Sequence, residues 1–97
     1  MSSKAIKCRL LWDEWNLEHI KKHNVSKYEV EIAIKGKEVV TETYKSRLLV
    51  FGKTKRGRLL TITLSFERQD DAYVVSARDV SSKERKIYEE YKANKTI

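Results

Sequence analysis

The segment YVVSARDVSSKER, residues 73–85, joins a predicted core strand to a predicted helix. Residues 73–77 are mostly β-branched or aromatic, which is typical of a strand buried in a sheet. Ser81 and Glu84 have the S-x-x-E spacing of a capping box, in which both side chains satisfy the first N–H groups of a helix. The strand therefore delivers Arg78 to the end of the sheet, three residues before the helix cap.

Arg78 has two interpretations that the residues around it leave open. A guanidinium fixed at the end of a sheet is suited to hold a phosphate through a bidentate fork. The alternative is a surface ion pair with Asp79 or Glu84, which contributes little beyond local order.

Upstream of this segment the sequence has the two-residue period of strands from about residue 38. Alternation is clearest where Leu60, Ile62 and Leu64 point one way. Short links between the strands imply an antiparallel meander, with one face against helices and one face more polar. The four predicted strands are 38–44, 47–54, 58–66 and 72–78.

The first third of the chain predicts an opening strand over 5–12 and then two short helices. Asp13 can cap the first helix, and Asn24 can end it because asparagine tolerates the left-handed conformation. Ser26 and Glu29 form a second capping box. The apolar stripe predicted for the first helix is Trp12, Trp15 and Ile20, with Leu17 as a further candidate. The stripe predicted for the second helix, which stops around Gly36, is Tyr28, Val30, Ile32, Ala33 and Ile34.

A last helix is predicted from Ser82 to about Ala93, with Ile87, Tyr88 and Tyr91 on its inner side. With 97 residues and no linker or repeat, we expect residues 1–97 to form one α+β domain. In this domain an N-terminal strand and two helices pack on an antiparallel meander sheet, and a C-terminal helix follows.

The net charge of +7 is concentrated in one segment. Residues 45–58 hold six Lys or Arg and no acidic residue, which favours a polyanionic partner such as nucleic acid. The alternatives are a solubility feature or a seat for an acidic protein. We expect no membrane segment, because no apolar run approaches the ~20 residues of a span. The single cysteine, Cys8, and the absence of a secretory signal favour a cytoplasmic protein.

Several side chains are candidates for chemistry. His19 and His23 have a spacing that can bind zinc, but the pattern lacks the glutamate of a catalytic H-E-x-x-H motif, so packing is the alternative. Lys22 beside His23 could move a proton and stabilise an anion, although the helix dipole alone also favours cations there. Three arginines at strand ends could converge on a phosphodiester, namely Arg47, Arg58 and Arg78.

One set of motifs occurs in a characteristic order along the chain: Trp12-Asp13-Glu14-x-Asn16-x-x-His19-Ile20-x-Lys22-His23-x-Val25-Ser26-x-x-Glu29, Arg47 with Gly52, Gly57-Arg58, Ser76-Ala77-Arg78, and Glu84-Arg85-x-x-Tyr88. This set of motifs resembles the BrnT family of small bacterial toxins. Asn24 departs from the glycine that is usual there, a mild change because both accept a positive φ. The match covers nearly the whole chain, from Trp12 to Tyr88.

The resemblance implies a RelE-like fold and the toxin of a type II toxin–antitoxin system. Such a toxin inhibits translation as an endoribonuclease that needs no metal or other cofactor. Its partners would be RNA and a BrnA-type antitoxin, with operator DNA bound only through the antitoxin. The resemblance assigns catalytic roles to Lys22, His23, Arg47 and Arg78. The residues predicted to contact RNA are Arg58, Lys53, Lys55 and Arg56.

Two alternatives retain the same fold without the enzyme. One is a non-catalytic module that binds RNA or DNA through the basic segment. The other is an interaction protein whose basic face seats an acidic partner, such as an antitoxin.

Overall fold

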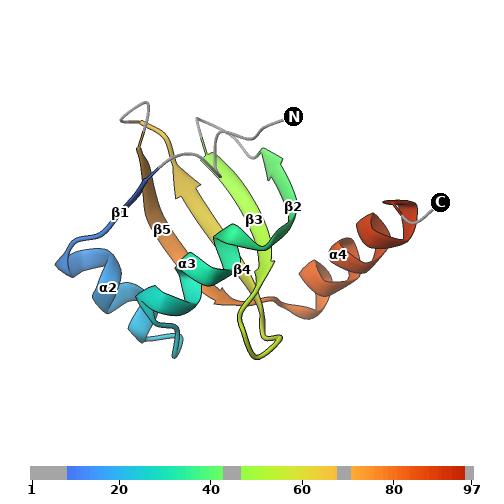
Figure 1. The fold of residues 1–97 in the computed structure, drawn as a ribbon, viewed down its shortest axis with the longest axis horizontal. Coiled ribbons are helices and arrows are strands. Elements are labelled where there is room, and N and C mark those ends of the chain that lie inside the picture. The colour runs from blue at the N-terminus through green and yellow to red at the C-terminus, as the bar shows by residue number, and fades with distance from the viewer. Residues whose placement is uncertain (1–8, 43–46, 68–70, 96–97) are drawn as a thin grey trace.

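The computed structural model describes residues 9–42, 47–67 and 71–95, and within them the chain is an α+β protein. Figure 1 shows α2 and α3 beside one sheet, and α4 projecting away from it. The elements are β1 (Leu10–Leu11), α2 (Glu14–Lys21), α3 (Lys27–Lys35), β2 (Lys37–Glu42), β3 (Arg47–Lys53), β4 (Leu59–Ser65), β5 (Ala72–Asp79) and α4 (Ser82–Lys95).

The sheet has the strand order β1-β5-β4-β3-β2. Strands β2 to β5 pair antiparallel with their neighbours, so the predicted meander is confirmed. Strand β1 pairs parallel with β5, which makes the sheet mixed. Of the predicted opening strand, residues 10 and 11 pair, and residues 5–8 lie outside the described residues. Other predicted positions outside them are 43–44 of the first meander strand and Lys45 of the basic segment.

The helix caps form as predicted because their signals are local. Asp13 accepts a hydrogen bond from the Asn16 N–H at 2.9 Å, and Ser26 accepts one from the Glu29 N–H at 3.2 Å. Asn24 adopts a φ of 59°, the left-handed conformation that separates α2 from α3. Gly36 is the C-cap of α3.

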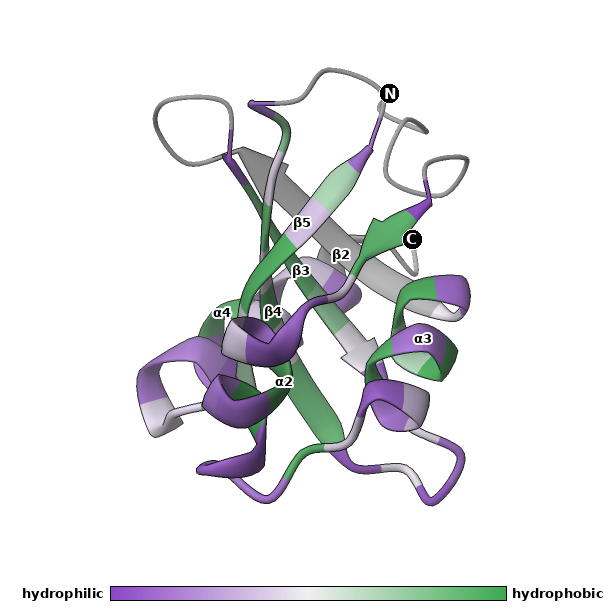
Figure 2. Ribbon diagram, turned by 90° about the vertical axis from the view of Figure 1, so that its left-hand side faces the viewer, coloured by the Kyte–Doolittle hydropathy of each residue, from purple (hydrophilic) through white to green (hydrophobic). Residues whose placement is uncertain are grey.

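One face of the sheet, here called the helix face, packs on α2 and α3. Its core joins Ile20, Val25, Val30, Ala33 and Ile34 to the inward residues of β3, β4 and β5. The helix and the sheet approach closely at Gly52 of β3, where a Cβ atom would collide with the backbone of Ala33 in α3. Figure 2 shows apolar colour in the strands, while α2 is largely polar.

The other face of the sheet, here called the opposite face, carries a smaller cluster of Phe51, Leu59 and Tyr88, with Leu49 and Val80 beside it. Tyr88 is the anchor that α4 contributes. The face that we predicted to be more polar carries Thr61, Thr63 and Ser65, of which Thr61 and Ser65 are buried and Thr63 is half-buried. The apolar cluster and the hydrogen bond from Thr61 to Glu84 of α4 cover part of this face.

Several aromatic residues predicted to be internal are exposed. On α2 the buried residues are Asn16 and Ile20, four apart on one face, whereas Trp15 is 58% exposed. Leu17 and Tyr28 are exposed too, and on α4 so are Ile87 and Tyr91. Helix α4 contacts the sheet through Glu84 and Tyr88, while Ile87 and Tyr91 stay exposed. No described helix combines the length and the hydropathy needed to cross a membrane.

Candidate functional site

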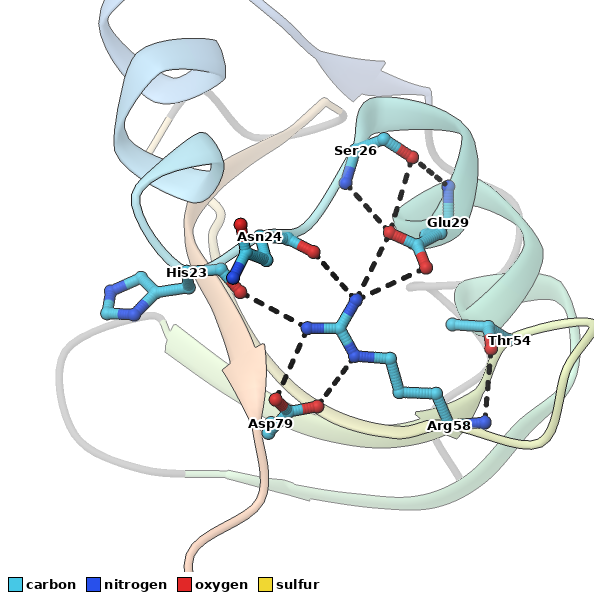
Figure 3. A network of polar contacts seen from close by, with 7 residues as sticks. All are labelled: His23, Asn24, Ser26, Glu29, Thr54, Arg58 and Asp79. Carbon is cyan, nitrogen blue, oxygen red and sulfur yellow. Dashed lines mark hydrogen bonds and ion pairs between the residues drawn. The ribbon is translucent and has the colours of Figure 1, made fainter.

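Arg58, which precedes β4, joins three parts of the fold (Figure 3). Its Nε and Nη2 donate to both carboxylate oxygens of Asp79 at the end of β5, at 2.6 and 3.2 Å. Its Nη1 donates to the Asn24 carbonyl at 2.7 Å and to the Glu29 carboxylate at 3.2 Å. Its Nη2 also donates to the His23 carbonyl at 3.1 Å. The guanidinium therefore ties the link between α2 and α3 to two strands.

These contacts use all five N–H groups of the Arg58 guanidinium. The hydrogen bonds with Asp79 are the main reason that the pKa of Arg58 is raised and the pKa of Asp79 is lowered. Because no donor is left over, a phosphate could bind Arg58 only by displacing a partner within the fold. The RNA contact that we predicted for Arg58 stays a prediction, and the geometry gives the side chain a structural use.

Arg78, one residue before Asp79 in β5, pairs with Glu84 in the first turn of α4. Its Nη1 and Nη2 donate to the two oxygens of Glu84 at 2.8 and 2.9 Å. Glu84 also accepts hydrogen bonds from the Thr61 hydroxyl and the Ser81 N–H, both at 2.9 Å. These donors, Arg78 first among them, lower the pKa of Glu84 to about 2. The ion-pair alternative for Arg78 is the arrangement that the structure contains.

The pairing with Glu84 leaves part of the Arg78 guanidinium available. Nη1 makes a further contact with the Asp79 carbonyl at 3.3 Å. The Nε–H and the second Nη2–H have no partner within the described residues. These two donors point in the same direction. They correspond to the Nε and Nη2 donors with which Arg58 binds the carboxylate of Asp79. The Arg78 side chain is 40% exposed, so solvent reaches part of it.

Arg58 and Arg78 lie at the same end of the sheet but on different faces. Residues directly opposite each other in an antiparallel pair share a face. Leu60, in the helix-face core, is opposite Asp79, the partner of Arg58. Thr61 is opposite Arg78, and both belong to the opposite face together with Glu84. The predicted convergence of these two guanidiniums therefore does not occur.

Arg47 begins β3 and lies opposite Ser65, at the other end of the sheet from the hairpin. It shares the opposite face with Arg78, because residues 47, 49, 51 and 53 alternate onto that face. Four residues of β4 separate the two positions, about 13 Å along the strand. They are also two strands apart, which adds about 10 Å across the sheet. The backbone positions of Arg47 and Arg78 are therefore separated both along and across the opposite face, and the convergence of their side chains stays a prediction.

Lys22 and His23 follow α2 and are exposed on the helix-face side of the molecule. Figure 3 shows the His23 ring directed away from Arg58, although the His23 carbonyl contacts it. His19 stacks on Trp15 with ring centroids 4.9 Å apart, and His23 meets His19 edge-on at 5.9 Å. Among the residues that the structure describes, no three metal-ligating side chains gather around one point.

The hairpin between β3 and β4 carries the remaining predicted RNA contacts. Gly57 has a φ of 83°, and its N–H donates to the Thr54 carbonyl at 2.9 Å, so a tight turn forms here. The side chains of Lys53, Lys55 and Arg56 are exposed around this turn. Lys53 faces Tyr88, its Nζ 6.0 Å from the ring centroid, which places Lys53 on the opposite face with Arg78.

Two polar residues with central positions were absent from our predicted site. Asn16 is fully buried and donates to the carbonyls of Leu11 and Val74, which fastens α2 to β1 and β5. The sequence did contain a signal for Asn16, because it lies three residues after the cap Asp13, at the position whose side chain completes a capping box. Thr61 orients Glu84 from within β4, and strand alternation gave no signal for that contact.

Comparison of the chain with known protein families, with curated proteins and with solved structures found no match.

Proposed function

We propose that this protein is an RNA-cleaving toxin of the RelE-like type, acting without a metal and paired with a DNA-binding antitoxin. The resemblance to the BrnT family implies this activity, and an α+β chain with two helices on an antiparallel meander is compatible with it. The observation that carries the proposal is the fork formed by the Nε–H and second Nη2–H donors of the partly exposed Arg78 on the opposite face.

The fork has the geometry that phosphate binding requires. Two parallel N–H groups match two oxygens of a phosphodiester and give a charge-assisted, oriented contact. Glu84 keeps the guanidinium in place through its other edge, at 2.8 and 2.9 Å. A held guanidinium loses little conformational entropy when it binds RNA, which favours tight and specific contact.

Positive charge nearby supports binding of a polyanion on the same face. Lys53 flanks Tyr88, and the exposed hairpin adds Lys55 and Arg56. Such a group of cations raises the rate of encounter with RNA and makes the affinity depend on salt.

In the proposed reaction the ribose 2′-hydroxyl attacks the adjacent phosphorus and the bond to the 5′-oxygen breaks. The 2′ proton must be removed and the 5′-oxygen must be protonated. Arg78 would hold the phosphate oxygens and stabilise the charge that grows on them. Lys22 and His23 are the proposed proton-transfer groups. Because they lie on the helix-face side, RNA would have to pass around the end of β5 to meet both sets.

That separation favours a second candidate, a non-catalytic module that binds RNA through the opposite face. Arg58 lies on the other face from Arg78 and is engaged within the fold, so the phosphate would lack that guanidinium. Such a module needs only Arg78 and the hairpin cations.

The test is incubation of the purified chain with an end-labelled RNA in EDTA, comparing wild type, Arg78→Ala and Arg85→Ala. Arg85 is an exposed arginine on α4 and provides a matched loss of charge. We expect Arg78→Ala to cut at least about 100-fold more slowly, as for loss of a group that stabilises transition-state charge. Arg85→Ala should stay within about twofold. Circular dichroism confirms that both variants fold.

Each other outcome has a definite meaning. If the wild type binds RNA in a salt-sensitive manner and leaves it intact, the protein is the non-catalytic RNA-binding module and not an endoribonuclease. Absence of both cutting and binding would favour an interaction protein with an acidic partner. Equal cutting by Arg78→Ala and wild type would remove Arg78 from the site.

A further inference from the structure

The exposed side of α2 has a shallow hollow of about 400 Å³, lined by Glu14, Trp15, Glu18, His19 and Lys22. Side chains four apart on a helix form ridges. One ridge, here called the acidic ridge, carries the carboxylates of Glu14 and Glu18 and ends at Lys22. The neighbouring ridge, here called the aromatic ridge, carries the rings of Trp15, His19 and His23. The hollow follows the groove between these two ridges.

The aromatic ridge offers a flat surface to solvent. His19 covers one face of the Trp15 indole, with the two rings 8° from parallel. Trp15 is still 58% exposed, so the remainder of the indole is open. A nucleobase can stack on such a ring. The stacking free energy is large for a single contact, and any of the four bases can stack, because each has a π-face.

The acidic ridge offers acceptors beside that surface. The carboxylates of Glu14 and Glu18 make no hydrogen bond or ion pair with other described residues. A carboxylate accepts two hydrogen bonds side by side. Guanine is the base with two adjacent donors, N1–H and N2–H, on its Watson–Crick edge, whereas adenine and cytosine carry one amino group beside an acceptor. The acidic ridge therefore favours guanine.

The basic end of the groove adjoins the end of β5. Lys22 lines the hollow, and the next residue, His23, accepts from Arg58, which in turn holds Asp79. A strand of RNA with a base in the hollow would place its phosphate toward Lys22, on the way to Arg78. The excess of seven positive charges in the chain disfavours the other ligand that suits a tryptophan beside carboxylates, a basic peptide.

We propose that this groove on α2 binds a guanine base of single-stranded RNA, stacked on Trp15 and held at its edge by Glu14 or Glu18. The identity of the ligand as RNA rests on the proposed function. The site itself is a different surface from that of Arg78, and it would set a preference for the sequence that is bound.

The test is titration of the full chain with 5′-GMP, 5′-AMP, 5′-CMP and 5′-UMP at matched ionic strength. Calorimetry gives the affinities. The indole N–H signals in NMR give the location, because a ligand in the hollow should shift the signal of Trp15 and leave that of Trp12 unchanged. We expect GMP to shift the Trp15 signal and to bind roughly tenfold more tightly than UMP. Trp15→Ala should weaken GMP binding roughly tenfold, since its ring is the stacking surface.

Two further variants separate the parts of the proposal. Glu14→Gln or Glu18→Gln should abolish the preference for GMP, and Glu89→Gln on the exposed side of α4 should not. Equal binding of all four nucleotides, or GMP binding that Trp15→Ala does not change, would overturn the assignment. So would a shift of the Trp15 signal by a lysine-rich peptide with none by any nucleotide.

Failure here is distinguishable from failure of the proposed function, because mononucleotide binding needs no cleavage. If the chain cuts RNA but binds no nucleotide at Trp15, the proposed function is supported and the guanine site in this groove is contradicted. If the chain binds GMP as described but leaves RNA intact, the guanine site is supported and the proposed cleavage of RNA is contradicted.

Discussion

Arg58 and Arg78 are at the same end of one sheet, yet the two faces give them different uses. On the helix face Arg58 meets two backbone carbonyls and two carboxylates, and all its donors are engaged. On the opposite face Arg78 meets Glu84 and keeps one fork of donors open. The comparison shows that the partners supplied by neighbouring elements decide whether an arginine holds the fold or faces a ligand.

Packing of the helix face is tested most severely by Gly52→Ala. The added Cβ would collide with the Ala33 backbone, so α3 must move away from β3. We expect a loss of about 3 kcal/mol in the free energy of unfolding, measured by urea denaturation. Gly36→Ala is the matched control, because its Cβ has ordinary contacts, and it should change stability by less than about 1 kcal/mol. Equal effects at both glycines would contradict the close approach.

The difference between the two arginines is tested directly by Arg58→Ala and Arg78→Ala. Removal of Arg58 leaves Asp79, Glu29 and two carbonyls without their shared donor, so we expect a loss of about 2 kcal/mol. Removal of Arg78 leaves Glu84 with two other donors, so the loss should be below about 1 kcal/mol.

Arg58→Lys sharpens this prediction, because it keeps the charge but cannot make five contacts in a plane. It should recover less than half of the stability that Arg58→Ala loses. If Arg78→Ala proved the more destabilising of the two alanine variants in urea, the assignment of structural and ligand-facing roles would be reversed.

The smallest expected effect concerns the pKa of Glu84 on the opposite face. Its pKa in the folded chain is about 2, below the ordinary 4.5, so its ionised form stabilises the fold above pH 4.5. That contribution is lost as the pH falls from 4.5 towards 2. Allowing for screening by solvent, we expect it to be about 1 kcal/mol.

The measurement is the free energy of unfolding between pH 5 and pH 2 for wild type and Glu84→Gln. The wild type should lose more stability over this range than the variant. Asp79, whose pKa is lowered by Arg58, contributes in the same direction, so Asp79→Asn serves as the parallel control. Identical slopes for wild type and Glu84→Gln would show that the Arg78–Glu84 pair does not stabilise the fold.

Local signals in the sequence predicted much of the fold. The capping pairs at Asp13, Ser26 and Ser81 all form, because cap residues bond groups only three positions away. The strands of the meander lie within two residues of their predicted bounds, because alternation and turn residues act over short distances. Exposure was predicted less well. Trp15 is in solvent because Asn16 and Ile20 take the buried side of α2.

The sequence by itself determined which segments become helices and strands, where they are capped, and that the positive charge gathers around the hairpin. Only the tertiary structure decided which arginine keeps donors for a ligand. Strand register puts Arg58 and Arg78 on different faces, and Arg58 meets the carbonyls of His23 and Asn24 only after α2 and α3 dock. The physical reason is that hydrogen-bond partners distant in sequence are set by packing, whereas caps and periodicity are set by the chain beside them.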